Sequence, residues 1–321
     1  MGPLGELGMR VPVVQAGMGG GLSGHRLAAA VSSAGGLGTI GILPAPELLQ
    51  EIEAARSHTS GPLAVNLLLP FARGKHFAAA AQADVVVTFW GRPERRVPKL
   101  WVHQCGSVAE ARAAREAGAD AVIAQGVEAG GHVRGAAPAL ELLAQVREAL
   151  PGDYPVLSAG GIADGADAAA RIAEGADAVV CGTRFLLSEE SGAHPLYKER
   201  LLAARKTILT ELFGVGWPAP HRVVENEATR RWLQAGERGP ALLRAFQRAS
   251  APVLARTPIA TQRRMAGAQT AGRPLFGPAA ATADGPASLV EAGPLYAGEC
   301  VERIAEIRPA GELVRELASR L

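Results

Sequence analysis

The sequence predicts a (β/α)8 barrel of the TIM type with a C-terminal, mainly helical addition. Short apolar runs of small and β-branched residues alternate with amphipathic helical segments, a pattern typical of βα units on a parallel sheet. Eight such runs fall within residues 1–183. Eight right-handed βα units close into a barrel whose active site lies at the C-terminal ends of the strands.

The expected elements follow one another in a regular order. Strands are expected at residues 11–15, 37–41, 63–67, 84–89, 100–103, 119–124, 155–159 and 176–182. Helices are expected at residues 25–34, 46–56, 108–117, 138–150 and 165–174. Several of these helices end at a glycine (Gly35, Gly118 and Gly175), as helix C-caps commonly do. The connections at 71–83 and 91–98 show no clear pattern and predict short or irregular helices.

Three regions are predicted along the chain: a cofactor-binding barrel over 1–190, a substrate or lid region over 191–295, and a C-terminal helix over 296–321 that returns to the barrel. From Leu196 to Arg248 apolar residues recur at helical spacing, including Leu201, Ile208 and Leu212. The stretch 249–294 is rich in Pro, Gly, Ala and Thr and predicts irregular structure or a lid.

The composition indicates that the protein binds small molecules. The 33 basic and 31 acidic side chains give a net charge of +2, with no block of like charges that would favour a nucleic acid or a membrane surface. No run of about 18 apolar residues and no signal peptide is present, so we expect a cytoplasmic protein. The sequence also permits a homodimer.

Neither the cysteines nor the histidines predict a metal site. The three cysteines lie far apart without a CxxC pair, and the histidines lack the spacing of metal ligands. Six histidines are therefore interpreted as surface or structural residues: His25, His58, His76, His103, His194 and His221. His103 is a partial exception, because the end of the fifth strand could bring it to the barrel mouth.

One glycine-rich segment imitates a dinucleotide-binding motif. Residues 19–24 satisfy G-x-G-x-x-G between a strand and a helix. That motif also needs an acidic residue about 20 positions later, and the second strand ends Thr39-Ile40-Gly41-Ile42 without one. We instead expect Ala16, Gly17 and Met18 to carry the end of the first strand beneath a flat ligand.

The most informative segment is residues 121–132. An apolar run ends at Gln125, and the glycine pair Gly130-Gly131 precedes His132. Glycines at the end of a parallel strand let the backbone approach a flat ligand, and a histidine there is well placed to handle a proton or bind an anion.

Two later loops predict a phosphate site. Ser158, Gly160 and Gly161 lie at the end of the seventh strand, and Cys181, Gly182 and Thr183 at the end of the eighth. In such barrels these two loops commonly bind phosphate through backbone N–H groups.

These motifs together resemble the FMN-dependent nitronate monooxygenases, formerly called 2-nitropropane dioxygenases, over nearly the whole chain. The resemblance rests on residues 14–18, 34–38, Asn66, 125–132, 159–162 and 182–185. It implies that His132 is catalytic. It also implies flavin contacts at Ala16, Gly17, Met18, Asn66, Gln125, Gly130, Gly161, Val180, Cys181, Gly182 and Thr183.

The chain departs from the family pattern at two positions, and these departures leave the substrate class open. Many members of the family carry a lysine after the histidine that ends the fifth strand, whereas this chain has Gln104. Many nitronate monooxygenases also read His-Arg-Gly after the glycine pair, whereas here Val133 separates His132 from Arg134. The related enoyl-ACP and quinone reductases use the same flavin barrel, with NAD(P)H as reductant, and Arg134 would then be a candidate contact for a nucleotide phosphate.

The sequence therefore predicts an FMN-dependent oxidoreductase that oxidises alkyl nitronates with O2. The alternative is a flavin-dependent NAD(P)H oxidoreductase, and a third reading is a non-catalytic flavin-binding protein. His132 has two candidate roles: a neutral imidazole would remove a proton from a nitroalkane, whereas a protonated one would stabilise an anionic substrate. The sequence leaves this choice open, because the pKa depends on burial.

Overall fold

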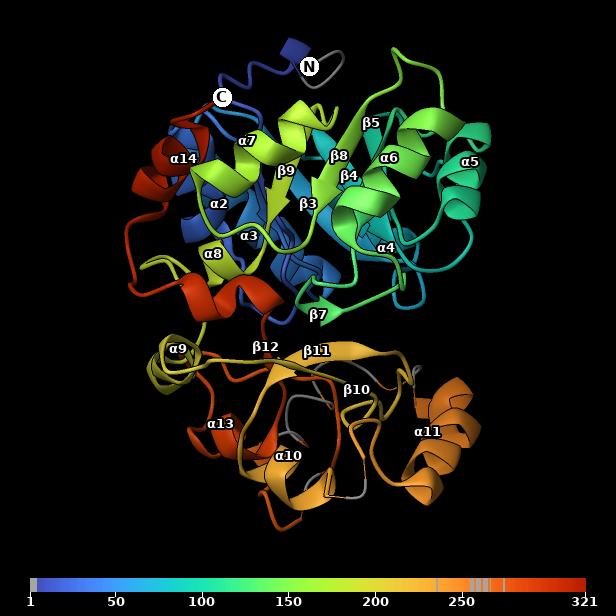
Figure 1. Cartoon of the computed structure of the whole chain (residues 1–321), viewed down its shortest axis with the longest axis vertical. Coiled ribbons are helices and arrows are strands. Elements are labelled where there is room, and N and C mark those ends of the chain that lie inside the picture. The colour runs from blue at the N-terminus through green and yellow to red at the C-terminus, as the bar shows by residue number, and fades with distance from the viewer. Residues whose placement is uncertain are drawn as a thin grey trace.

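The computed structural model describes residues 5–234, 236–254, 257, 261, 265, 267–273 and 275–321. Its main feature is a closed parallel barrel, with a smaller region packed over one end (Figure 1). In Figure 1 the C-terminal ends of the strands face this smaller region, and both chain termini lie at the opposite end of the barrel.

All eight predicted strands are present. Their order in the sheet is β1-β9-β8-β6-β5-β4-β3-β2, and a parallel bridge between Val14 and Leu37 closes the circle. The strands are β1 (Val13–Gln15), β2 (Gly38–Ile40), β3 (Leu63–Leu68), β4 (Val85–Phe89), β5 (Leu100–Cys105), β6 (Ala121–Gln125), β8 (Val156–Ala159) and β9 (Ala178–Cys181).

Helices cover the outside of the barrel. The five predicted helices are present, and the unclear connection at 71–83 contains a sixth, short one. They are α2 (His25–Ser33), α3 (Ala45–His58), α4 (Gly74–Ala80), α5 (Val108–Glu116), α6 (Ala139–Ala149) and α7 (Gly165–Ala173). The other unclear connection, 91–98, contains no helix, so β4 runs to β5 through an irregular segment.

Alternation along each strand divides the core into two layers. Inward-facing residues such as Val102, Ile123 and Leu157 fill the barrel, whereas their neighbours Trp101 and Val122 pack against the helices. This period of two determines which residues at the strand ends point into the barrel mouth.

The last helix, α14 (Ala310–Ala318), fills the position of an eighth outer helix, because the helix after β9 is only the short α8 (Thr183–Leu186). Pro309 precedes α14, and the fully buried Leu313 and Leu317 pack in one cluster with Val13 and Val179 of the barrel. The chain end thereby seals the outside of the barrel where β1 and β9 meet.

The prediction of a mainly helical addition is wrong for part of that region. α9 (Pro195–Leu202), α10 (Glu227–Trp232), α11 (Ala241–Leu254) and α13 (Ser288–Ala292) are helices, but the region is organised around an antiparallel sheet. Its strands are β10 (Ile208–Thr210), β11 (His221–Val224) and β12 (Leu295–Tyr296). A short apolar run is compatible with either a helix or a strand. Here the runs form strands because they pair with distant segments of the chain. Part of 249–294 lies outside the described residues.

We expect Leu313→Ala to destabilise the protein by about 2–5 kcal/mol, because it leaves a cavity beneath α14. Urea denaturation would measure the change in the free energy of unfolding. The control is Leu321→Ala, a leucine that is 42% exposed, which should cost less than about 0.5 kcal/mol. Equal effects of the two substitutions would show that α14 is not part of the cooperative core.

Candidate active site

The candidate site lies at the barrel mouth, where a loop from the barrel joins the small sheet of the added region. After β6 the chain forms the two-residue strand β7 (Gly131–His132), which pairs antiparallel with β11. His132 lies opposite His221, and Gly131 lies opposite Arg222. The predicted catalytic histidine is therefore positioned by backbone pairing across two regions of the chain.

Gln125 fixes the loop that carries His132. Its side chain points into the mouth from the end of β6, and its Nε2 donates to the backbone oxygen of His132 at 3.0 Å. Its Oε1 accepts from the backbone N–H of Arg134 at 3.1 Å. The side chain of Gln125, which was predicted to contact flavin, thus holds the loop that carries His132.

The imidazole of His132 is packed among aromatic rings. Trp217 stacks on it with ring centroids 3.6 Å apart and an interplanar angle of 19°, and Tyr296 lies 5.5 Å away. The Nε2 atom is shielded from solvent and has no hydrogen-bond partner among the described residues. Burial, with a smaller contribution from the nearby His221, lowers the pKa of His132 well below its usual value, so the ring is neutral at pH 7.

His221 is a neutral histidine fixed by the backbone. Its Nδ1 lies 2.9 Å from the oxygen of Ala219, and its Nε2 accepts from the backbone N–H of Phe213 at 3.2 Å. Because an acceptor at Nε2 cannot carry a proton, the tautomer with the proton on Nδ1 is the one that satisfies both contacts. Burial lowers the pKa of His221 to about 4. The sequence reading of His221 as a hydrogen-bonded structural residue agrees with this geometry.

Sequence reasoning missed the tryptophans at the mouth. Trp90 follows β4, and Trp217 lies in the loop between β10 and β11. Trp217 packs edge-on against both Trp90 and Phe71, with centroids 5.4 and 5.3 Å away. The position of Trp90 directly after a predicted barrel strand was the one available signal, whereas nothing in the sequence placed Trp217 near the barrel.

The predicted cofactor residues divide by the direction of their side chains. Ala16, Asn66 and Val180 share the inward face of their strands with the barrel core. The buried Asn66 amide makes no hydrogen bond with the residues that the structure describes. Ser158 and Cys181 alternate with inward residues and face the outer helices, so only their backbone is available to a ligand at the mouth.

Met18 and Thr183 have roles within the protein. The backbone N–H of Met18 donates to Ser23 Oγ at 2.8 Å, and its side chain packs against the outer core clusters. The Thr183 hydroxyl accepts from the backbone N–H of Gly298 at 2.8 Å, which ties the loop after β9 to the returning C-terminal segment. Gly17 lies so close to Asn66 that a Cβ would come within 2.3 Å of the Asn66 Cβ.

The loops after β8 and β9 have the geometry expected of a phosphate cradle. Gly160 and Gly161 have φ angles of +112° and +75°, which side-chain-bearing residues rarely adopt. Among the described residues, neither backbone N–H donates to a backbone acceptor, and the two carbonyls are held by Arg171 and Arg303. A Cβ on Gly182 would have Ala16 as its nearest neighbour at 3.8 Å, so there is open space beside this loop.

Gly130 serves close packing, because its Cβ would lie 2.4 Å from the backbone nitrogen of Gly298. Arg222 reinforces the same junction. Its buried guanidinium donates from Nε and Nη2 to the oxygen of Val127 at 3.1 and 2.8 Å, and it pairs with Glu299 at 2.9 Å. The loop 126–130 is therefore clamped between the barrel and the added region.

The two uncertain residues on β5 point in opposite directions. His103 faces the outer layer and hydrogen-bonds Thr88 Oγ1 at 2.8 Å, and burial lowers its pKa to about 4. It is a packing residue. Gln104 shares the inward face with Val102 and is half-buried at the mouth, where the family's frequent lysine would stand.

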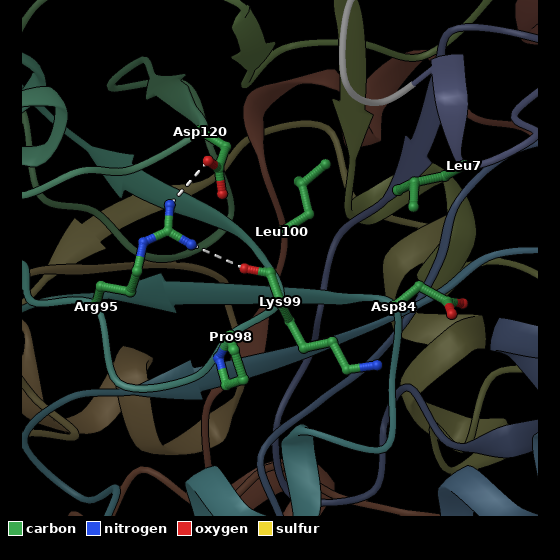
Figure 2. A pocket seen from close by; sticks show the side chains of 7 residues that line it. All are labelled: Leu7, Asp84, Arg95, Pro98, Lys99, Leu100 and Asp120. Carbon is green, nitrogen blue, oxygen red and sulfur yellow. Dashed lines mark hydrogen bonds and ion pairs between the residues drawn. The ribbon is translucent and has the colours of Figure 1, made fainter.

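A hollow lies where β4, β5 and β6 begin, at the end of the barrel away from the mouth, and Figure 2 shows the residues that line it. It is lined by Leu7, Asp84, Arg95, Pro98, Lys99, Leu100 and Asp120. Arg95 pairs with Asp120 at 2.8 Å and donates to the oxygen of Lys99. Asp84 accepts from the backbone N–H of Leu63. Arg95, Asp84 and Asp120 are therefore engaged within the protein.

The described residues contain neither a metal centre nor a membrane-spanning helix. No group of three or more His, Cys, Asp or Glu side chains could hold a metal ion. No helix in the same part of the chain is long and apolar enough to cross a membrane.

The barrel and the comparison with known proteins together identify an enzyme of the oxidoreductase class. The model of the nitronate monooxygenase family matches residues 4–92 and 93–320, and the chain belongs to this family. Its members are in general flavin-dependent and act on small molecules.

Individual relatives carry two different names. The chain is 34% identical over 268 residues to a Mycobacterium tuberculosis protein named (3aS,4S,5R,7aS)-5-hydroxy-7a-methyl-1-oxo-octahydro-1H-indene-4-carboxyl-CoA dehydrogenase, covering 77% of this chain and 72% of that protein. It is also 34% identical over 279 residues to a probable nitronate monooxygenase from Staphylococcus saprophyticus, covering 70% and 78%.

Solved structures show the same division. FabK from Thermotoga maritima is 30% identical, with a TM-score of 0.76, over 98% of this chain and 93% of that one. A nitroalkane oxidase from Streptomyces ansochromogenes is 33% identical, with a TM-score of 0.77, over 99% and 97%.

We expect Trp217→Ala to raise the pKa of His132, because removing the indole admits water and relieves the burial that lowers this pKa. NMR titration of histidine-labelled protein should show no titration of His132 near pH 6.5 in the unmodified chain. In the variant the midpoint should move toward about 6.5. Trp232→Ala, in the added region, is the control and should leave the titration unchanged. An unaltered His132 titration in Trp217→Ala would rule out shielding by the indole.

Proposed function

We propose that the protein is an FMN-dependent nitronate monooxygenase that oxidises alkyl nitronates with O2. The observation that carries the proposal is the buried, neutral and unpartnered Nε2 of His132 at the mouth of a flavin-family barrel. A buried polar atom without a partner costs about 1–3 kcal/mol, and such an atom at the mouth of a barrel is well explained by a role toward a ligand.

The residues at the mouth fit FMN. Gly160, Gly161 and Gly182 would receive the phosphate through backbone N–H groups, and the space beside Gly182 leaves room for it. Asn66 would offer its side-chain amide to the ring system, with Ala16, Gly17 and Val180 beneath it. When bound, FMN supplies the redox chemistry with the substrate and O2. The other predicted cofactor residues would shape the site mainly through their backbone: Met18, Gly131, Ser158, Cys181 and Thr183.

The lowered pKa of His132 supports one of its two candidate roles. A protonated imidazole that stabilises an anion requires a pKa near or above the working pH, and burial moves the pKa of this ring the other way. The neutral ring can accept the α-proton of a nitroalkane. His132 is therefore proposed as a general base that converts the neutral nitroalkane to its nitronate within the site.

A second candidate function is an NAD(P)H-dependent flavin oxidoreductase that reduces an enoyl thioester or a quinone. Arg134 favours it, because this cationic side chain stands at the rim two residues after His132, with its guanidinium over the Trp90 ring at 4.6 Å. The names of the FabK structure and of the CoA dehydrogenase relative point the same way. However, Arg134 is already paired with Glu110 at 2.6 Å, which weakens it as a phosphate ligand.

We expect Gly182→Val to fold but to lose FMN, since the backbone accepts a Cβ here and the side chain would fill the phosphate space. Release of the chromophore by denaturation, followed by chromatography, identifies and counts the flavin. Gly152→Val, at an open position far from the mouth, is the matched control and should keep it. Stoichiometric FMN in folded Gly182→Val, or FAD in the unmodified protein, would contradict the assignment.

We expect His132→Ala to lower kcat/KM for a neutral nitroalkane by about 10²- to 10⁴-fold while a pre-formed alkyl nitronate is still oxidised, because the nitronate has already lost its proton. Oxygen uptake measures both reactions, and His58→Ala, an exposed residue of α3, is the control. Equal losses with both substrates would assign His132 to orienting the substrate. Rapid flavin reduction by NAD(P)H with no nitronate turnover would favour the reductase.

A further inference from the structure

Trp90 stands out among the residues at the barrel mouth. Its φ angle is +62°, in the left-handed region that costs a residue with a bulky side chain about 1–3 kcal/mol. Its indole Nε1 is shielded from solvent and has no acceptor among the described residues. Backbone strain and an unpaired donor at one residue suggest that something other than packing favours this arrangement.

Other tryptophans of the chain show what packing alone looks like. Nε1 of Trp101 donates to Thr88 Oγ1 at 2.7 Å, and Nε1 of Trp232 donates to the oxygen of Ala271 at 3.2 Å. Both indoles satisfy their single donor within the protein, as buried tryptophans usually do. The indole N–H of Trp90, in contrast, has no acceptor among the described residues, and Trp90 lies at the barrel mouth, where a ligand is expected.

Trp90 and His132 both contact the indole of Trp217. Trp217 contacts both rings, at 5.4 Å from Trp90 and 3.6 Å from His132, so their centroids lie no further apart than the sum of these distances. Arg134, which belongs to the loop that carries His132, holds its guanidinium over Trp90. Two unpartnered groups thus belong to one aromatic cluster: an imidazole nitrogen that can accept a proton and an indole N–H that can donate a hydrogen bond.

The ligand of the Trp90 indole N–H must be a hydrogen-bond acceptor. The guanidinium of Arg134 lies over the indole ring and is paired with Glu110 at 2.6 Å, so this pair adds no net charge beside the indole. An indole N–H can only donate, so its ligand must carry an acceptor. The neutral His132 adds no positive charge of its own.

We propose that Trp90 is a substrate-binding residue whose indole N–H donates a hydrogen bond to an oxygen of the nitro or nitronate group. This holds one end of the group at Trp90 while the adjacent carbon faces His132. The inference rests on the proposed function, because that function supplies the N–O oxygen as the acceptor. It makes the residue after β4 a determinant of affinity for the substrate.

The test compares the flavin-loaded unmodified protein with variants at Trp90 and at Trp232. Trp90→Phe removes the N–H and keeps an aromatic ring, and Trp232→Phe removes an indole N–H in the added region as the matched control. Oxygen uptake gives kcat and KM for ethyl nitronate, and calorimetry gives the Kd of nitrate, a planar and unreactive N–O anion. Replacing Trp90 by benzothienylalanine, which keeps the indole shape without the N–H, serves as a second variant if Trp90→Phe loses flavin.

We expect KM for ethyl nitronate and the Kd of nitrate to rise by about 10- to 100-fold in both Trp90 variants, as for loss of a hydrogen bond to a charged ligand, with kcat changed much less. Trp232→Phe should match the unmodified protein. Unchanged KM and nitrate Kd, a fall in kcat alone, or no nitrate binding to the unmodified protein would overturn the proposal. If the unmodified protein binds nitrate through Trp90 but does not oxidise nitronates, the proposed function fails while the anion contact stands.

Discussion

The pairing of β7 with β11 is the constraint on which the site depends. Two residues of the barrel, Gly131 and His132, form backbone contacts with His221 and Arg222 of the added region. Gln125 holds this strand from below, and Arg222 holds the preceding loop from the side. A loop of glycines alone would be mobile, because glycine has the largest conformational freedom to lose. These contacts fix one position for the imidazole.

Burial at this junction also determines the charge of the site. His132 and His221 lie 5.4 Å apart with little access to water, and protonation of either would place an uncompensated cation in an apolar cluster. His221 could gain a proton on Nε2 only by losing its contact with the Phe213 N–H. Both rings are therefore neutral at pH 7, which is the state that the proposed role of His132 as a base requires.

How much could be predicted differs between the barrel and the site. The barrel strands were predictable because each is a local apolar run with its own flanking glycines, and the inward direction of Asn66 and Gln125 follows from the period of two. The same period turns Ser158 and Cys181 outward, a result that needed the true strand register. β10 could not be recognised, because Ile208 and Leu209 also fit a helical spacing and only their partner strand decides the matter.

The sequence by itself determined the barrel, the glycine loops at the strand ends and the histidine at the mouth, since these depend on local periodicity and on motifs of adjacent residues. Only the tertiary structure decided that Trp217 covers His132, that Trp90 keeps an unpaired N–H, and that the imidazole is neutral. Those properties arise because Trp217, which lies 85 positions after His132 and 127 after Trp90, packs into one cluster with them. Burial depends on such contacts, and no local pattern of residues encodes it.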